Sequence, residues 1–131
     1  MMDAGYVVSL REAFLKWLGR GLPAYVPRLK ISPFDAMDII HEAGGVAVLA
    51  HPGTGVQDYL IPYLIKKGLA GVEAYHPEHT RQAEKKYANI AHRYKLAAMG
   101  GSDFHREGMR MIGCRRTSLG QLAILASHKS F

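Results

Sequence analysis

The sequence predicts an α/β protein whose strands are parallel. Three short apolar segments, residues 46–50, 71–75 and 96–100, are separated by segments with the apolar spacing of helices. Strands that alternate with helices form crossover units, and such units build parallel sheets. The segment VAVLA at 46–50 has no charge and no polar alternation, which predicts a strand covered on both faces.

The helices are predicted from their first residues and from their apolar spacing. Helices are expected to begin at Leu10 (after the capping box of Ser9 and Glu12), at Pro33 (after Ser32), at Pro62, after Thr80, and near Leu119. Two glycines and two prolines in GRGLPAYVPRLKI predict a loop after the first helix. We expect one domain over 1–131, with a helix and loop segment at 1–31, βα units at 32–118 and a C-terminal helix at 119–131.

The composition bounds the function. Seventeen Lys and Arg against 11 Asp and Glu give a net charge of +6, which favours an anionic partner such as a phosphorylated small molecule or a nucleic acid. No apolar stretch approaches the roughly 20 residues that cross a bilayer, and the N-terminus lacks a signal-peptide pattern, so we expect a cytoplasmic protein without a membrane partner. The single cysteine, Cys114, excludes an internal disulfide and is expected to be a small half-buried residue.

Histidines and carboxylates accompany all three predicted strands. His51 follows the first strand, Glu73 lies in the second with His76 just after it, and Asp103 and His105 follow the third. The carboxyl ends of parallel strands meet at one edge of a sheet, where α/β proteins carry their chemistry. The sequence therefore predicts that these side chains share one rim.

The spacing of Asp103 and His105 suggests a metal centre. In an extended chain they would lie about 7 Å apart on one side, which suits two ions about 3.5 to 4 Å apart that clamp a phosphoryl group. Other interpretations stay open: a capped turn for this pair, a turn at His51, and a buried ion pair with Lys or Arg for Glu73.

Three motifs carry a resemblance to a known family. GGVAVLAHPG, GVEAYHPEHT and GSDFH, in this order, resemble the C-terminal half of the polymerase and histidinol phosphatase (PHP) family of metal-dependent phosphoesterases. The nearest branch acts on nucleoside 3',5'-bisphosphates and RNA 5' ends, and AFLKWLGRGLPAYVPR at 13–28 resembles a segment of that branch. The likeness runs from about Gly5 to Thr117. It implies a portion of a distorted (β/α)7 TIM-like barrel with an N-terminal helical insertion segment.

The resemblance also implies site residues and cofactors. The family binds two or three divalent ions, commonly manganese, zinc, iron or magnesium. Its motifs imply that His51, Asp103 and His105 are metal ligands, with His51 and Asp103 in catalytic roles. The implied contacts to substrate phosphate are His76, His79, Arg28 and Arg106. The family's bridging glutamate belongs to an earlier strand than Glu73.

The implied function is metal-dependent hydrolysis of phosphomonoester or phosphodiester bonds in nucleotides or short RNA. The HxH pair of the family's first half does not occur in these 131 residues. We therefore expect a fragment that binds metal weakly and is inactive without the missing N-terminal half of the domain. Two alternatives remain: a basic nucleic-acid-binding α/β module, and a half-barrel that assembles with another chain as a homo-oligomer or swapped dimer.

Overall fold

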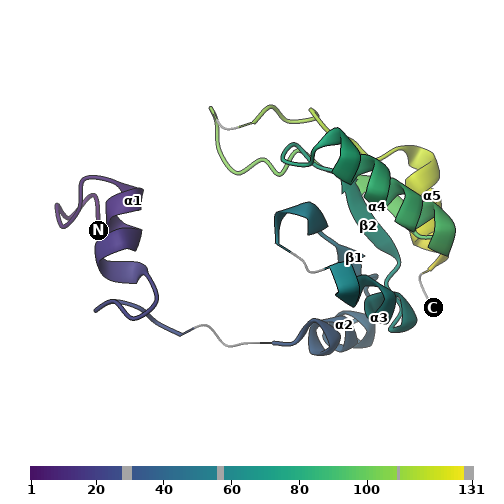
Figure 1. The fold of residues 1–131 in the computed structure, drawn as a ribbon, viewed down its shortest axis with the longest axis horizontal. Helices are drawn as coiled ribbons and strands as arrows, with labels where there is room; N and C mark the ends of the chain where they lie inside the picture. The colour runs from purple at the N-terminus through teal and green to yellow at the C-terminus, as the bar shows by residue number, and fades with distance from the viewer. Residues whose placement is uncertain (28–30, 56–57, 109, 129–131) are drawn as a thin grey trace. The chain divides into compact units, whose positions relative to one another are not determined.

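The computed structural model describes residues 1–27, 31–55, 58–108 and 110–128. The chain forms two compact units, Met1–Ile31 and Ser32–Phe131 (Figure 1). The division of one domain into segments 1–31, 32–118 and 119–131 stays a prediction. In the described part of the chain, no helix is both long enough and apolar enough to cross a bilayer.

The first unit contains the helix that the capping box predicts. The hydroxyl of Ser9 accepts a hydrogen bond from the backbone N–H of Glu12 at 3.1 Å, and the Glu12 carboxylate accepts one from the N–H of Val8. The segment begins as α1, Leu10–Ala13, and continues as a π-helical stretch, Phe14–Leu18. The expected helix is confirmed, and its second half is π-helical, because the N–H of Gly19 bonds five residues back to Phe14.

The second unit contains a parallel three-stranded sheet, as expected. Its strands are β1, Val48–Leu49, β2, Gly71–Tyr75, and β3, Ala97–Gly100, in the order β1-β2-β3. Both pairs are parallel. The first strand is shorter than predicted, and Val48 is 36% exposed rather than covered on both faces. This expectation was wrong because β1 pairs only with β2 among the described residues and therefore lies at an edge.

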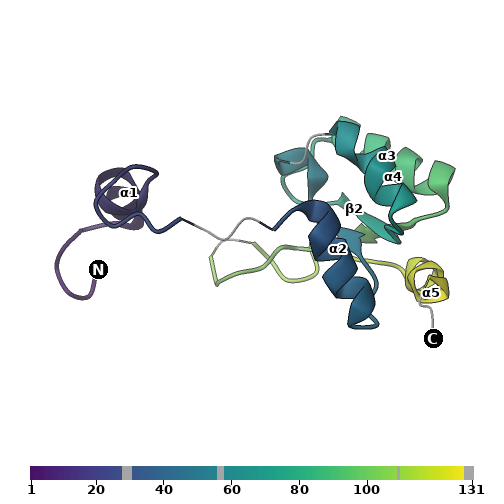
Figure 2. The ribbon, with the colours of Figure 1, turned by 90° about the horizontal axis from the view of Figure 1, so that it is seen from below.

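Helices cover the sheet and bury its core. They are α2, Pro33–Glu42, α3, Ile61–Lys66, α4, Arg81–Tyr94, and α5, Leu119–Ser127, with 3-10 turns at Pro52–Thr54 and Asp58–Leu60. In Figure 2, α3 and α4 lie on one side of β2 and α5 lies on the other. Val72 and Ala74 are fully buried in a core that includes Tyr87 and Ala91 of α4. Glu73, between them, points to the opposite face of the strand.

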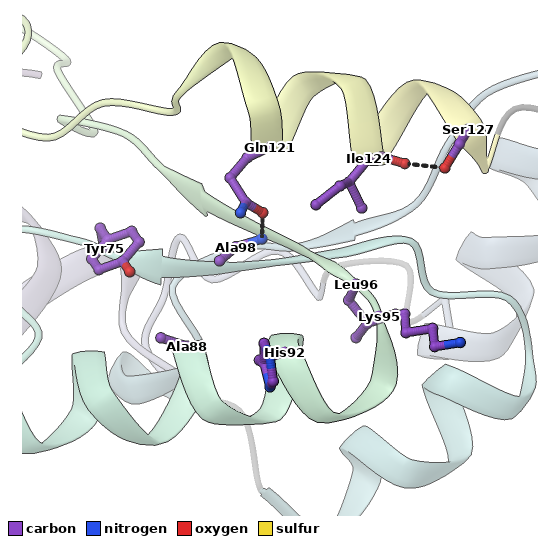
Figure 3. A pocket seen from close by; sticks show the side chains of 9 residues that line it. All are labelled: Tyr75, Ala88, His92, Lys95, Leu96, Ala98, Gln121, Ile124 and Ser127. Atoms are coloured by element: carbon purple, nitrogen blue, oxygen red, sulfur yellow. Dashed lines mark hydrogen bonds between the residues drawn. The ribbon is translucent and has the colours of Figure 1, made fainter.

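The outer edge of β3 is covered by side chains from the C-terminal segment. The N–H of Ala98 donates to the Gln121 side chain at 2.6 Å, and the Thr117 hydroxyl bonds both the N–H and the carbonyl of Gly100. A groove of about 710 Å³ lies beside this edge, between α4, β3 and α5 (Figure 3). None of the predicted site residues lines it.

The end of α4 offers a test of stability. Lys95 closes this helix in the left-handed region, at φ 56° and ψ 32°, where glycine is preferred. We expect Lys95→Gly to raise the free energy of unfolding by about 0.5–1 kcal/mol, because the strain on a residue with Cβ exceeds the entropy cost of glycine. Urea unfolding followed by circular dichroism measures this change. The control is Lys95→Ala, which keeps the strain, and a glycine variant no more stable than the alanine variant would contradict the prediction.

Candidate functional site

The loops after the three strands bring several predicted residues together. The backbone N–H of His51 donates to the Glu73 carboxylate at 2.8 Å, which ties the end of β1 to β2. The ring centroids of His51 and His76 lie 5.2 Å apart. His76 Nε2 lies 3.4 Å from Asp103 Oδ2, and Asp103 Oδ1 lies 3.7 Å from His105 Nδ1. Side chains that follow three successive strands are therefore neighbours in space, in the order His51, His76, Asp103 and His105.

Backbone strain marks two of these positions. His51 has φ 26° and Asp103 has φ 48°, and Lys95 is the other described non-glycine residue with positive φ. Such conformations persist only where the surrounding structure enforces them, and they are concentrated at functional sites. The condition under which Asp103 and His105 would lie about 7 Å apart on one side, an extended chain, is not met, because Asp103 is left-handed. The imidazole of His105 instead turns back and donates from Nδ1 to the carbonyl of Asp103 at 2.8 Å.

The hydrogen bonds assign the ring protons of two candidate ligands. The Thr54 hydroxyl donates to the carbonyl of His51, so it accepts the bond from His51 Nδ1 at 2.9 Å. His105 likewise uses its Nδ1 proton for the carbonyl of Asp103. In both neutral rings the lone pair is then on Nε2. Histidines that bind metals are commonly oriented in this way by a partner on the other nitrogen.

His76 has the opposite arrangement. Its Nδ1 accepts the N–H of Glu78 at 3.2 Å, so the neutral ring carries its proton on Nε2. The side chain is 1% exposed, and Nε2 is a buried polar atom without a hydrogen-bond partner among the described residues. This donor faces Asp103 Oδ2 at 3.4 Å. It is therefore suited to an acceptor such as a carboxylate or phosphate oxygen.

His79 is occupied by the backbone on both sides of its ring. Its Nδ1 donates to the carbonyl of Ala74 at 2.9 Å, and its Nε2 accepts the N–H of Gly53 at 3.1 Å. The residue is 7% exposed and lies against Tyr87, with ring centroids 5.3 Å apart. A contact to substrate phosphate would require the loss of one of these bonds. These two bonds link the turn after His51 to the end of β2, and a contact of His79 with phosphate stays a prediction.

The structure adds Arg110, which the sequence analysis did not select. Its Nη1 donates to Asp103 Oδ2 at 2.5 Å, and its Nη2 pairs with Glu78. Hydrogen bonding by Arg110 is the main reason that the pKa of Asp103 is lowered from its usual value, and His76 lowers this pKa further. The only sequence signal was the basic composition of residues 106–116.

Of the other predicted cations, only Arg106 lies within the described residues. Arg106 is exposed, and no hydrogen bond or ion pair of its side chain occurs within the described ranges. Arg28 lies outside the described residues. Cys114 is exposed rather than half-buried.

The side chains at this rim are of the types that bind divalent metals, but they are too few to form a metal site. Imidazole nitrogens and carboxylate oxygens suit manganese, zinc and iron. Yet across residues 1–27, 31–55, 58–108 and 110–128, no three His, Cys, Asp or Glu side chains form a group that could hold an ion. The described residues therefore provide ligand types for a metal without a complete set of ligands.

Sequence relatives fit the motifs. A phosphoribosyl 1,2-cyclic phosphate 1,2-diphosphodiesterase of Eggerthella lenta is 46% identical over 71 residues, which cover 54% of this chain and 27% of that protein. A 3',5'-nucleoside bisphosphate phosphatase of Chromobacterium violaceum is 36% identical over 121 residues, 86% of this chain and 42% of the relative. A 5'-3' exoribonuclease of Escherichia coli is 32% identical, covering 81% and 38%. The chain thus spans less than half the length of these relatives.

Solved structures share the fold. The crystal structure of a candidate metal-dependent phosphoesterase from Bifidobacterium adolescentis matches with a TM-score of 0.78 and 25% identity, over 99% of this chain and 48% of that one. These matches fit the resemblance of the three motifs to the PHP phosphoesterases. An amidohydrolase from Chromobacterium violaceum, solved with bound sulfate and no metal, matches at TM-score 0.66 and 34% identity, over 97% and 48%. No protein-family profile matches the chain.

The comparisons confirm the fold class and leave the finer expectations untested. The α/β class with a parallel sheet is confirmed. The (β/α)7 barrel, the insertion segment and the roles of individual site residues stay predictions.

Proposed function

We propose that this chain supplies part of the active site of a metal-dependent phosphoesterase that cleaves phosphomonoester or phosphodiester bonds of nucleotides or short RNA. The proposal depends on one observation: His51, His76 and Asp103, which follow three different strands, lie next to one another. His51 and Asp103 also have strained backbones with positive φ. The names of the relatives, a bisphosphate phosphatase, an exoribonuclease and a cyclic phosphate diphosphodiesterase, support the reaction class.

Four of the site residues have a stated role in this proposal. His51, Asp103 and His105 would hold divalent ions, two or three of them in an intact domain, with manganese, zinc, iron or magnesium as candidates. A bound divalent metal supplies Lewis-acid activation of water and of the phosphate oxygens. The Nδ1 bonds of His51 and His105 keep their Nε2 lone pairs available. His76 holds a proton at Nε2, where it can be donated to a phosphate oxygen.

The remaining ligands would come from outside this stretch of sequence. Three ligands leave much of the coordination of two or three ions unfilled, and no complete group occurs in the described ranges. In the proposal, β1, β2 and β3 form part of a distorted (β/α)7 barrel that a further N-terminal portion completes. We therefore expect the 131-residue chain alone to bind metal weakly and to lack turnover.

A chimera tests the proposal directly. The matched stretch of the Chromobacterium violaceum bisphosphate phosphatase is replaced by this chain. With Mn²⁺, Mg²⁺ or Zn²⁺, phosphate release is measured from a nucleoside 3',5'-bisphosphate, and mononucleotide release is measured from 5'-phosphorylated RNA. We expect metal-dependent turnover by the chimera and none by the chain alone. Circular dichroism and sedimentation verify that the chimera is folded and monodisperse. A folded chimera without turnover on either substrate would contradict the proposal.

The two alternative functions have less support. A nucleic-acid-binding module would present its cations to solvent, but Arg110 is paired with Asp103 and Glu78, and Arg115 is paired with Glu84. A half-barrel that adds a strand from another chain needs a free sheet edge. The β3 edge is bonded by Gln121 and Thr117, which counts against pairing there, so an added strand would have to pair with the β1 edge.

A further inference from the structure

We propose that Glu73 is a positioning residue whose carboxylate fixes two loops of the site at once. One carboxylate oxygen holds the backbone of His51, and the other sets the path of the chain after β3 at Gly101. The inference rests on the proposed function, in which His51 and Asp103 belong to the active site. Glu73 acts through these residues and does not itself touch the substrate.

His51 has a backbone conformation that its neighbours in the sequence do not favour. At φ 26° and ψ 58° it lies near the left-handed region, which costs free energy for a residue with a Cβ atom. Pro52 follows it, and the residue before a proline is biased toward extended conformations. Because the local sequence favours an extended His51, contacts with other parts of the chain must enforce the observed conformation.

Glu73 supplies the contact that fixes His51 itself to the sheet. Thr54 bonds the carbonyl and the ring of His51, but it lies in the same turn and moves with it. His79 holds the turn at Gly53, two residues further on. The N–H of His51 donates to Glu73 Oε2 at 2.8 Å, across 22 residues. This bond joins the strained residue directly to β2.

The carboxylate takes the place of a backbone acceptor. The described pairing of β1 with β2 ends at Leu49, so the sheet provides no backbone partner for the N–H of His51. A backbone donor that is withdrawn from water needs an acceptor. Glu73 is half-buried in β2, and a carboxylate accepts a stronger hydrogen bond than a neutral carbonyl does.

The second oxygen of Glu73 lies against the chain that leads to Asp103. A Cβ atom added at Gly101 would lie 2.7 Å from Glu73 Oε1, so the carboxylate packs on the backbone at a position where only glycine leaves room. Gly101 comes directly after β3, and its N–H donates to the carbonyl of Tyr75 at 3.2 Å. One side chain of β2 therefore contacts the chain after β1 and the chain after β3. These contacts set the separation of the two strained positions, His51 and Asp103.

Amide hydrogen exchange of the 131-residue chain, followed by NMR, tests the hold on His51. In Glu73→Ala we expect the His51 N–H to exchange about 10- to 100-fold faster, as for the loss of a hydrogen bond to a charged group. The coupling constant between the amide and α protons of His51 should also increase, because the residue relaxes toward an extended φ. The N–H of Ala97, which donates to the carbonyl of Ala70, reports on the sheet and should change by less than about threefold. Equal acceleration of both amides would overturn the inference, since Glu73 would then serve overall stability alone.

Two conservative variants separate the reach of the side chain from its charge. Glu73→Gln keeps an acceptor oxygen at the same reach, so exchange at His51 should stay within about threefold of the unchanged chain. Glu73→Asp keeps the charge but is one methylene shorter, so it should behave like Glu73→Ala, and it serves if the alanine variant fails to fold. Full protection of His51 in Glu73→Asp would contradict the inference.

Gly101→Ala tests the second contact. The added Cβ should displace the carboxylate and speed exchange at His51 when Glu73 is present, and it should have no effect in the Glu73→Ala background. An effect of equal size in both backgrounds, or none in either, would show that Gly101 and His51 are not linked through Glu73.

Turnover of the chimera separates this inference from the proposed function. Glu73→Ala should lower phosphate release from a nucleoside 3',5'-bisphosphate by about 10- to 100-fold, as for a site residue moved out of place, and Glu73→Gln should recover most of it. A chimera that is inactive with Glu73 in place would contradict the proposed function, while exchange at His51 still decides whether Glu73 positions it. Unchanged turnover in Glu73→Ala, with the His51 amide no longer protected, would overturn the positioning role alone.

Discussion

Asp103→Asn in the chimera is expected to lower turnover by about 10²- to 10⁴-fold. A carboxylate is replaced by a neutral amide, which is a poor ligand for a divalent cation and which leaves Arg110 without its partner at Oδ2. Loss of several kcal/mol of metal-dependent stabilisation of the transition state corresponds to a decrease of this order. The rate of phosphate release from a nucleoside 3',5'-bisphosphate, at saturating metal, measures the change.

The stability of this variant distinguishes a functional from a structural Asp103. The thermal midpoint of the metal-free chain should fall only slightly, because the amide keeps the size of the side chain and Glu78 remains a partner for Arg110 once the Asp103–Arg110 ion pair is lost. Asp38→Asn is the matched control: it breaks the ion pair of Asp38 with Lys67, 2.6 Å apart, and it should leave turnover unchanged. If Asp103→Asn keeps its activity but melts at a much lower temperature, Asp103 serves the fold instead.

The sequence was informative where structure depends on near neighbours in the chain. Ser9, Ser32, Thr80 and Ser118 each accept a backbone N–H at the start of a helix, because capping needs only the residues of the first turn. The collection of His51, His76 and Asp103 at one rim followed from topology, since successive parallel strands end at the same edge.

Features that depend on tertiary contacts could not be predicted from the sequence. The left-handed backbone of Asp103, which invalidates the extended-chain spacing to His105, is enforced by surroundings that no local pattern encodes. Glu73 was weighed as an ion-pair partner for Lys or Arg, but its carboxylate accepts the N–H of His51, 22 residues away. Arg110 meets Glu78 across 32 residues, so its importance appears only once β2 and β3 lie side by side.

His79→Ala is expected to lower the free energy of unfolding by about 2–4 kcal/mol. The substitution leaves the buried carbonyl of Ala74 and the N–H of Gly53 without their partners, and it opens a cavity beside Tyr87. Urea unfolding monitored by circular dichroism measures this loss. His92→Ala is the control, because His92 is exposed on α4 and its removal should cost less than about 0.5 kcal/mol.

A double-mutant cycle with Gly53 shows whether His79 acts through the turn after His51. A Cβ atom at Gly53 would lie 2.8 Å from His79 Cδ2 and 2.9 Å from Nε2, closer than ordinary packing allows. Gly53→Ala should therefore cost about 1–3 kcal/mol in the unchanged chain and clearly less in His79→Ala, where the ring is absent. Equal costs in the two backgrounds would mean that His79 does not fix this turn, and that His51 depends for its position on Glu73 and Thr54 alone.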